Sequence, residues 1–294
     1  MAWIGGDQGT ATGRVVLSAS RRTELLHFPD RFLEALEKFP PETVHSVVLW
    51  TKTPSLLFRR DRRELLQRLL EYDQIYVQLS VTGLGSSFLE PGVPDHSKTL
   101  DMLPKLIEIV GSPKRVNVRF DPILNLADAQ GHVLTNFHMF PEIAQRCREH
   151  DVREFTVSWA TIYPRVRRRL AALGFVELEA SPSLKRRQAR TLNEWARSFG
   201  INVKGCCTQP FLPGFGCING GVLSSLHPKG KSCTLKRAAG QRKLCLCTSS
   251  RDIGWYYPCP NGCVYCYAQP KVAATSSRKG YILGCLDARE LGGA

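Results

Sequence analysis

The chain has 294 residues, 43% of them hydrophobic, and its 40 Lys and Arg against 26 Asp and Glu give a formal net charge of +14. This length and apolar content exclude a wholly disordered protein and favour one large α/β domain with a small appendage. No segment has the ~20 consecutive apolar residues that cross a bilayer, and the N-terminal residues do not have the pattern of a secretory leader. We therefore expect a cytoplasmic protein without a membrane segment.

Apolar, β-branched runs alternate with helical patterns over the first two-thirds of the chain. Strands are expected at residues 15–19, 45–51, 75–82, 115–120, 155–159 and 201–204. Helices are expected at residues 31–39, 60–72, 97–110, 141–150, 164–174 and 183–200. Asp30 and Ser183 are expected to cap their helices, and Pro104 to kink or restart the third. Six strand–helix repeats predict an α/β fold with a parallel sheet or barrel.

Polar residues follow the expected strands, where the functional groups of parallel α/β folds gather. They are Ser20, Arg21, Arg22, Lys52, Thr82, Gly83, Arg119, Asp121 and Ser158. Arg21 and Arg22 suit an anion site, because guanidinium groups bind carboxylate or phosphate in a fork geometry; a plain surface loop is the alternative. For Arg119 and Asp121, a structural ion pair is as good an interpretation as a functional one.

The cysteines are concentrated after residue 200, where ten of the eleven lie. A reducing compartment argues against disulfides, so this clustering predicts metal binding. Cys259, Cys263 and Cys266 form a Cys-x3-Cys-x2-Cys loop. Three thiolates can hold three corners of a four-iron cluster and leave one iron open to a small molecule, whereas a closed cluster or a structural zinc site requires a fourth ligand.

A second group of cysteines precedes this loop in a segment without helical or strand periodicity. Cys206 or Cys207, together with Cys217, Cys245 and Cys247, supplies four thiolates for an auxiliary site. We favour an iron–sulfur cluster there, and zinc stays open because the spacing does not distinguish the two. The segment therefore looks organised by metal rather than by a hydrophobic core.

The excess of positive charge points to an anionic partner, for which nucleic acid is the usual candidate. The basic residues fall in runs such as 59–63, 165–169, 185–190 and 236–243. Runs of this kind are more often solvated helix faces. Nucleic-acid binding is therefore an alternative rather than the main prediction.

Several segments together resemble the DUF1848 family, whose C-terminal cysteine cluster is similar to that of radical S-adenosylmethionine (SAM) enzymes. They are Ser-Ala-Ser-Arg-Arg-Thr at 18–23, Trp-Thr-Lys-Thr-Pro at 50–54, Thr-Gly-Leu-Gly at 82–85 with Glu90-Pro91, Arg-Phe-Asp-Pro-Ile at 119–123, Gly-Gln-Arg at 240–242, and the run from Cys245 through Cys266 to Ala268. The resemblance covers residues 14–270. Glu24 stands where the family tends to have Asp.

The likeness to radical SAM enzymes implies a partial (β/α)6 TIM-like barrel that is circularly permuted. The cluster loop of those enzymes follows the first strand, whereas here it comes last. Residues 253–257 are then expected to replace the first strand and to lie beside residues 15–19, which is feasible where chain ends lie close together. The expected organisation is a barrel at 14–204, a Cys-rich iron–sulfur segment at 205–270 that completes it, and a tail at 271–294.

The same likeness implies a mechanism and site residues. Cys259, Cys263 and Cys266 would hold a [4Fe-4S] cluster, and SAM, bound at the open iron, would be cleaved reductively to a 5'-deoxyadenosyl radical that abstracts hydrogen. The electron would come from a low-potential donor such as ferredoxin or flavodoxin. Arg21, Lys52, Arg119 and Asp121 are the expected catalytic residues. Ser20, Arg22, Thr82, Gly83 and Tyr265 are the expected cofactor-binding residues.

Two other functions compete with this prediction. One is a zinc- or iron–sulfur-stabilised nucleic-acid-binding protein without radical chemistry. The other is an iron–sulfur electron carrier, which the charged strand ends argue against because a carrier has no need of such a pocket. The sequence does not identify a substrate.

Overall fold

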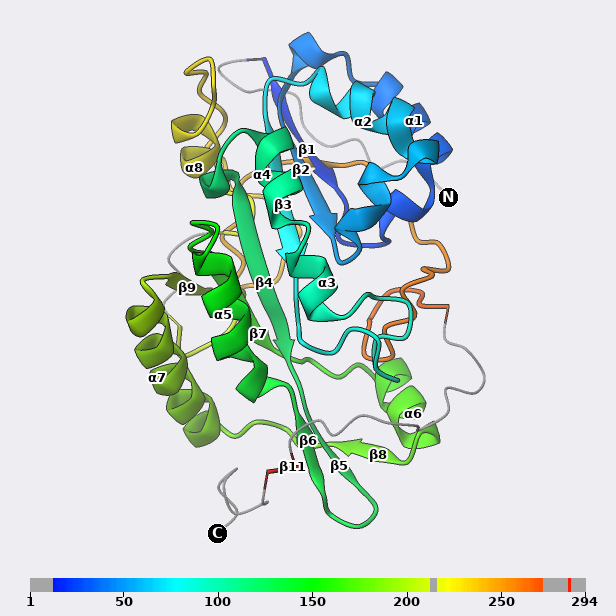
Figure 1. The fold of residues 1–294 in the computed structure, drawn as a ribbon, viewed down its shortest axis with the longest axis vertical. Coiled ribbons are helices and arrows are strands. Elements are labelled where there is room, and N and C mark those ends of the chain that lie inside the picture. Colours follow the sequence, from blue (N-terminus) through cyan, green and yellow to red (C-terminus); the bar gives the residue numbers. More distant parts are fainter. Residues whose placement is uncertain (1–12, 212–215, 272–284, 287–294) are drawn as a thin grey trace.

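The computed structural model describes residues 13–211, 216–271 and 285–286, which are built around a parallel sheet of seven strands (Figure 1). In spatial order they are β10 (Arg251–Asp252), β1 (Val15–Ala19), β2 (Val44–Thr51), β3 (Ile75–Ser80), β4 (Val116–Ile123), β7 (Glu154–Trp159) and β9 (Asn202–Gly205). The predicted α/β fold with parallel strands is confirmed. Within the described residues β10 and β9 end the sheet on opposite sides, so it is open and no closed barrel is present.

The strand that adjoins β1 comes from the far end of the chain. β10 pairs in parallel with β1, Leu17 opposite Arg251 and Ser18 opposite Asp252. The sequence predicted that the strand beside β1 lies at residues 253–257, but the strand begins two residues earlier, at Arg251. Ile253 N–H still donates to the Ser18 carbonyl at 3.0 Å, and the chain leaves the sheet after this bond. The segment nevertheless lies at the predicted edge, beside residues 15–19.

Helices connect the parallel strands. They are α1 (Pro29–Glu37), α2 (Arg63–Leu70), α3 (His96–Leu100), α4 (Leu103–Val110), α5 (Phe140–Arg148), α6 (Pro164–Ala172), α7 (Pro182–Phe199) and α8 (Gly220–Ser225). Short 3-10 turns lie at Leu25–His27, Pro41–Thr43, Pro54–Phe58, Arg60–Arg62, Pro113–Arg115 and Phe137–Met139. In the described part of the chain, none of the helices is both long enough and apolar enough to pass through a bilayer.

Proline decides where several helices begin, and it corrects two predicted caps. Pro29 and Pro182 occupy first-turn positions, which suit proline because it has no N–H to leave unbonded. Asp30 therefore lies inside the first turn of α1, and α7 is capped by Ser181 rather than Ser183. Pro104 lies in the first turn of α4, so the helix does restart there as predicted.

A small antiparallel sheet was not predicted. Its strands, in spatial order, are β11 (Cys285–Leu286), β6 (Val133–Thr135), β5 (Asn125–Asp128) and β8 (Phe175–Glu177). Strands of two to four residues are too short to show an alternating pattern. Residues 285–286 of the expected tail pair with β6, and the rest of the tail beyond residue 271 lies outside the described residues.

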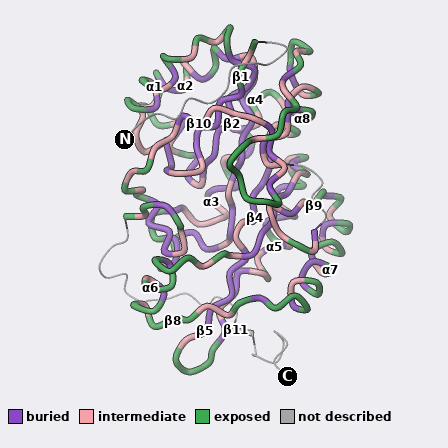
Figure 2. The backbone as a smooth tube through the Cα atoms, turned by 180° about the vertical axis from the view of Figure 1, so that it is seen from behind, coloured by how far each residue is buried: buried purple, intermediate pink, exposed green. Residues whose placement is uncertain are grey.

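The two faces of the large sheet are covered differently. Alternate strand residues such as Leu17, Val47 and Val77 pack with the helices in one large apolar core. The opposite face carries Val16, Val48, Trp50 and Tyr76, which pack against the segment that follows β9, including Ile218, Leu223 and Cys247. Figure 2, seen from behind, shows this segment crossing the sheet. Metal alone therefore does not organise the Cys-rich segment, because it also has apolar contacts of its own.

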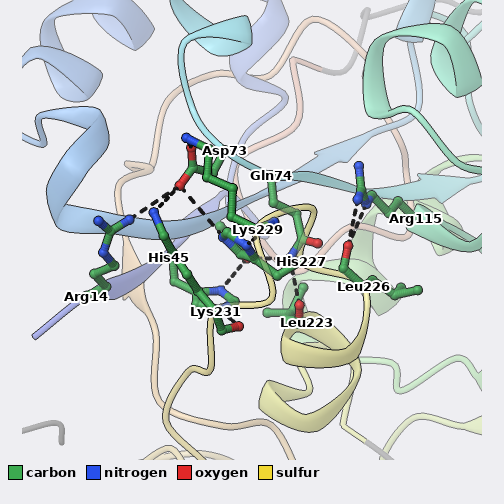
Figure 3. Close-up of polar contacts among 11 residues, drawn as sticks. Arg14, His45, Asp73, Gln74, Arg115, Leu223, Leu226, His227, Lys229 and Lys231 are labelled. Atoms are coloured by element: carbon green, nitrogen blue, oxygen red, sulfur yellow. Dashed lines mark hydrogen bonds and ion pairs between the residues drawn. The ribbon is translucent and has the colours of Figure 1, made fainter. Parts of the chain in front are cut away.

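Polar contacts hold the crossing segment at the opposite end of the sheet from the cysteine loop (Figure 3). The Asp73 carboxylate accepts from Lys229 at 2.5 Å, from Lys231 at 2.6 Å and from Arg14 at 3.4 Å. Gln74 donates to the Leu223 carbonyl at 2.9 Å. The hydrogen bonds from Lys229 and Lys231 hold the pKa of Asp73 well below its ordinary value.

This anchor leads to a prediction about stability. Asp73→Asn should lower the free energy of unfolding by about 1–2 kcal/mol at pH 7, because two lysines lose their shared counter-charge. A lowered carboxyl pKa stabilises the fold above the unfolded-state pKa of about 3.9, so the difference from wild type should shrink as the pH falls below about 4. Urea denaturation at several pH values measures it. Asp61→Asn, which removes the ion pairs of an exposed carboxylate with Arg59 and Arg62, is the control and should cost clearly less, because solvent screens those pairs. Equal losses of unfolding free energy in the two variants would show that the contacts of Asp73 do not hold the crossing segment in place.

Candidate functional site

The Cys259, Cys263 and Cys266 loop is closed at its base by main-chain hydrogen bonds. Cys259 N–H donates to the Gln269 carbonyl at 2.7 Å, and Lys271 N–H donates back to the Cys259 carbonyl at 2.8 Å. Cys266 N–H donates to the Cys263 carbonyl at 3.0 Å. All three cysteines are free thiols, and Cys263 is buried. The loop therefore presents three thiols from one short, well-bonded turn.

The loop docks on the Gly- and Pro-rich segment after β3. Val264 N–H donates to the Leu89 carbonyl at 2.9 Å, and Gly92 N–H donates to the Asn261 carbonyl at 3.1 Å. A Cβ atom on Gly92 would lie 2.2 Å from the Pro260 carbonyl oxygen. Only glycine permits this approach, so the long loop after β3 is shaped to receive the cysteine loop.

A buried ion pair lies directly beside the thiols. Lys52 Nζ is 2.7 Å from Glu90 Oε1 and 3.1 Å from the Tyr265 hydroxyl. The same Glu90 oxygen accepts from the Thr82 hydroxyl at 2.8 Å and from the Tyr265 hydroxyl. Burial lowers the pKa of Lys52, but the Glu90 carboxylate and the Cys263 side chain outweigh burial and raise it overall. Lys52 is therefore a fixed positive charge at the edge of the loop.

The electrostatic balance of the thiols depends on these cations. Burial raises the pKa of Cys263, and Lys52 opposes the increase. Burial also raises the pKa of Cys266, against the charges of Arg169 and Lys52, and it raises the pKa of Cys259 to about 11. Metal uptake requires thiolates and releases their protons. The neighbouring cations would favour that ionised form.

A second buried carboxylate, Glu24, supports the opposite side of the loop. It accepts from Lys52 N–H at 2.7 Å and from the Asn261 side chain at 3.4 Å, and His27 Nε2 lies 2.7 Å from Asn261 Oδ1. Burial raises the pKa of Glu24, and its Oε1 atom is buried without a hydrogen-bond partner. An unsatisfied buried oxygen is costly in a purely structural carboxylate, which makes Glu24 a candidate for ligand or proton binding.

The strand ends in the middle of the sheet carry a stacked group of cations. The guanidinium groups of Arg21 and Arg119 lie 5.1 and 5.0 Å from the Trp50 ring centroid. Arg119 forms an ion pair with Asp121, which also accepts from the Ser158 hydroxyl. The structure thus contains the ion pair that the sequence left open. Burial opposes the charge of Arg119, but Cys217 and Asp121 raise its pKa well above the ordinary value.

The second group of cysteines gathers over Arg119. Thiol–thiol hydrogen bonds connect Cys207 with Cys206 and Cys245, and connect Cys217 with Cys206 and Cys247. The Sγ atoms of Cys206 and Cys217 are 3.5 Å apart, and Arg119 Nη1 donates to Cys217 Sγ at 2.9 Å. A hydrogen bond from Cys217 keeps the pKa of Cys247 below its ordinary value despite burial, and Arg21 adds to this effect. Arg21 therefore lies within electrostatic reach of this group.

The thiols of the two cysteine groups are the donors that a metal centre could use in the described residues. Across residues 13–211, 216–271 and 285–286, no three His, Cys, Asp or Glu side chains are arranged to hold one metal ion. The chemistry of the donors, free and largely buried thiols beside Lys52, Arg169 or Arg119, suits an anionic cluster.

The site residues expected from the sequence fall into three places. Lys52, Thr82 and Tyr265 meet at Glu90, and Arg21, Arg119 and Asp121 lie along the middle strand ends. Ser20 and Arg22 instead contact Asp252, at 2.8 and 4.0 Å, and so fasten β10 to the end of β1. Gly83 packs against Met139, and a Cβ atom there would lie 2.7 Å from it.

Sequence reasoning did not assign Glu24, Glu90, Asn261 or Arg169 to the site. Glu24 and Glu90 lie in segments that resemble the family, but no role was assigned to them from the sequence. A carboxylate next to a strand-end cation is a signal that could have found Glu90, but the pairing with Lys52 depends on a loop whose path the sequence does not fix. Asn261 lies inside the cysteine motif, where only the cysteines were assigned.

The Lys52–Glu90 pair gives a testable prediction. Glu90→Gln should lower the free energy of unfolding by about 2–4 kcal/mol, because Lys52 is left buried without its counter-charge. Lys52→Met combined with Glu90→Gln should recover at least half of that loss, since removing both charges of a buried pair is nearly neutral. Urea midpoints measure both, with the exposed Glu71→Gln as control. A double variant no more stable than Glu90→Gln alone would show that the two charges are not coupled.

The model of a domain of unknown function, DUF1848, matches residues 28–268. No curated protein and no solved structure matches the chain. The chain belongs to the DUF1848 family.

Proposed function

We propose that the chain is a radical SAM enzyme. The observation that carries the proposal is the position of the Cys259–Cys266 loop: it follows β10, which lies in parallel beside β1, so the loop emerges at the carboxyl edge of the sheet. That edge is where α/β enzymes place their reacting groups. On this proposal the open sheet corresponds to a permuted partial barrel in which β10 serves as the first strand.

The cluster would be held by Cys259, Cys263 and Cys266. Bound there with one iron open, a [4Fe-4S] cluster supplies an electron for reductive cleavage of SAM to a carbon radical. The loop offers three thiols, and two cations, Lys52 and Arg169, act on them electrostatically alongside the carboxylates Glu90 and Glu24. The positive charges of Lys52 and Arg169 would compensate the negative charge of the cluster. The reducing electron would come from a partner protein such as ferredoxin or flavodoxin.

The remaining side chains would position SAM and the substrate. Lys52 and Tyr265 already contact Glu90. They would therefore form part of the wall of the site rather than bind the carboxylate of SAM. Arg21 is better suited to bind the SAM carboxylate, because it stacks on Trp50 and no described carboxylate lies within 4.0 Å of it. Glu24, with its unpartnered oxygen, is suited to accept a hydrogen bond from an amine or hydroxyl group.

The second cysteine group would hold an auxiliary metal–thiolate centre. Its five members exceed the four ligands that one cluster or one zinc ion needs, so Cys206 and Cys207 are alternatives for a single position. Arg119 and Arg242, which lie 2.9 and 3.7 Å from cysteine sulfurs, would compensate its charge. We favour iron–sulfur, and zinc is the alternative.

The first test is cleavage of SAM. Cys263→Ser should abolish reductive formation of 5'-deoxyadenosine, because an alkoxide is a poor substitute for the thiolate ligand. Cys147→Ala, which removes a buried thiol of α5 remote from the loop, should retain activity. The product is quantified by chromatography after anaerobic reconstitution and dithionite reduction. Unchanged cleavage in Cys263→Ser would show that the site is misassigned.

The second test is metal content. Anaerobically reconstituted protein should carry about eight irons per chain, or about four if the auxiliary site takes zinc. Cys217→Ala combined with Cys247→Ala should remove only the auxiliary metal and leave about four irons. Cys233→Ala, in the same segment but hydrogen-bonded to the Gly220 carbonyl, is the matched control and should change nothing. Zinc as the only metal would rule out the proposed enzyme.

A further inference from the structure

A cavity of about 450 Å³ lies beside the second cysteine group. Its wall combines the end of β7, the first turns of α7, the strip at 206–210 after β9, and Arg242. The volume is in the range of about 300–1,000 Å³ that holds a small-molecule ligand. Neither the Cys259–Cys266 loop nor the residues assigned to SAM line this space, whereas Cys206, Cys207 and Arg242 of its wall also belong to the second cysteine group.

The charged residues of its lining are all positive. They are Lys185, Arg186 and Arg242, and no described carboxylate lines the cavity. The neighbouring cavity of about 190 Å³ differs: it is lined by Arg167 and Lys185 together with Glu177 and Glu179. The larger cavity therefore has an unbalanced positive potential, and the smaller one does not.

No described carboxylate forms a close ion pair with the three cations, although Glu177 and Asp121 act on Lys185 and Arg242 from farther away. Among residues 13–211 and 216–271, no Asp or Glu oxygen lies within 4.0 Å of Lys185, Arg186 or Arg242. Arg242 instead directs Nη2 toward Cys206 Sγ at 3.7 Å. Like charges around one hollow repel each other, and a bound anion would remove that repulsion.

The backbone of α7 adds to the same potential. Pro182 at its first turn lines the cavity, and the first turn contains no acidic residue. The amino end of an 18-residue helix has a partial positive charge that favours anions. Lys185 and Arg186 follow one turn later, so one helix end contributes two cations and its dipole.

The rest of the lining suits an organic group. Trp159 and Ala160 are apolar, while Ser158, Thr208 and Gln209 provide hydroxyl and amide groups. The indole N–H of Trp159 is already bonded to Gln188 Oε1 at 2.6 Å, so its contribution to the cavity is its ring. An apolar floor beside three cations fits a molecule with one strongly anionic end.

We propose that this cavity binds a small molecule that carries a phosphate group, and that this molecule is the substrate; the substrate role rests on the proposed radical SAM function. A phosphate ester has about 1.5–2 negative charges near neutral pH, which matches three cations better than a single carboxylate does. Asp121 acts electrostatically on both Lys52, which lies beside the Cys259–Cys266 loop, and Arg242, which lines the cavity. Tyr163 acts electrostatically on Arg242, and its ring is 6.2 Å from that of Tyr267, the residue after Cys266.

The test measures anion binding without any SAM chemistry. Inorganic pyrophosphate is titrated into reconstituted, full-length protein in an anaerobic calorimeter at fixed ionic strength. Arg186→Gln combined with Arg242→Gln should weaken binding at least tenfold. Arg190→Gln combined with Lys243→Gln removes the same charge from exposed positions of α7 and the 236–243 run outside the cavity, and it should weaken binding less than threefold. Arg242→Lys, which keeps the charge, should retain most of the affinity.

Each outcome decides between interpretations. Equal weakening in the two double variants would show a diffuse surface field, such as one for nucleic acid, and would overturn the proposal, as would undetectable binding to the wild type. Thermal unfolding of all variants excludes a folding defect, and Arg242→Lys provides a second measurement if the double variant unfolds. Loss of SAM cleavage with intact pyrophosphate selectivity would refute the radical function but leave the anion site. Intact SAM cleavage without a difference in pyrophosphate affinity between the two double variants would refute the anion site but leave the radical function.

Discussion

The parallel pairing of β10 with β1 is the constraint on which the site depends. Only two residues of β10 enter the sheet, but side-chain contacts reinforce them: Ser20 donates to Asp252 at 2.8 Å, and the Thr23 hydroxyl donates to the Trp255 carbonyl at 2.7 Å. These contacts hold residues 251–257 against the first strand. They thereby deliver the cysteine loop to the carboxyl edge, next to Lys52 and Glu90.

The same pairing dictates the path of the preceding segment. β9 ends the described sheet on one side and β10 ends it on the other, so the segment described at 206–211 and 216–250 lies across the width of the sheet. It crosses the face on which α8 packs, where polar strand residues such as Gln78 and Asn117 lie beside apolar ones. Gln78 donates to the Cys217 carbonyl. The connection from β9 to β10 thus places five cysteines over Arg119. Its first residues, 206–210, form part of the wall of the cation-lined cavity.

The regular strands and helices of this fold could be predicted from the sequence, because their residues repeat with a strand or helix period. The six main strands and the restart at Pro104 follow from hydrophobic periodicity and proline chemistry, and the position of the late segment beside β1 followed from the family resemblance. The caps of α1 and α7 were missed because Pro29 and Pro182 start those helices earlier than the periodicity indicates. The β5–β6–β8 sheet was missed because its strands are too short. Glu90 was missed because its pairing with Lys52 is made by an irregular loop, which carries no periodic signal.

Electron paramagnetic resonance of the reduced protein, with and without SAM, tests most directly whether the Cys259–Cys266 loop holds a SAM-binding cluster. The Cys217→Ala, Cys247→Ala variant would isolate the cluster of Cys259, Cys263 and Cys266. If one iron is open, adding SAM should change the g values of the reduced cluster, because that iron gains new ligands. An iron–sulfur signal that is identical with and without SAM would contradict the claim that this loop holds a SAM-binding cluster.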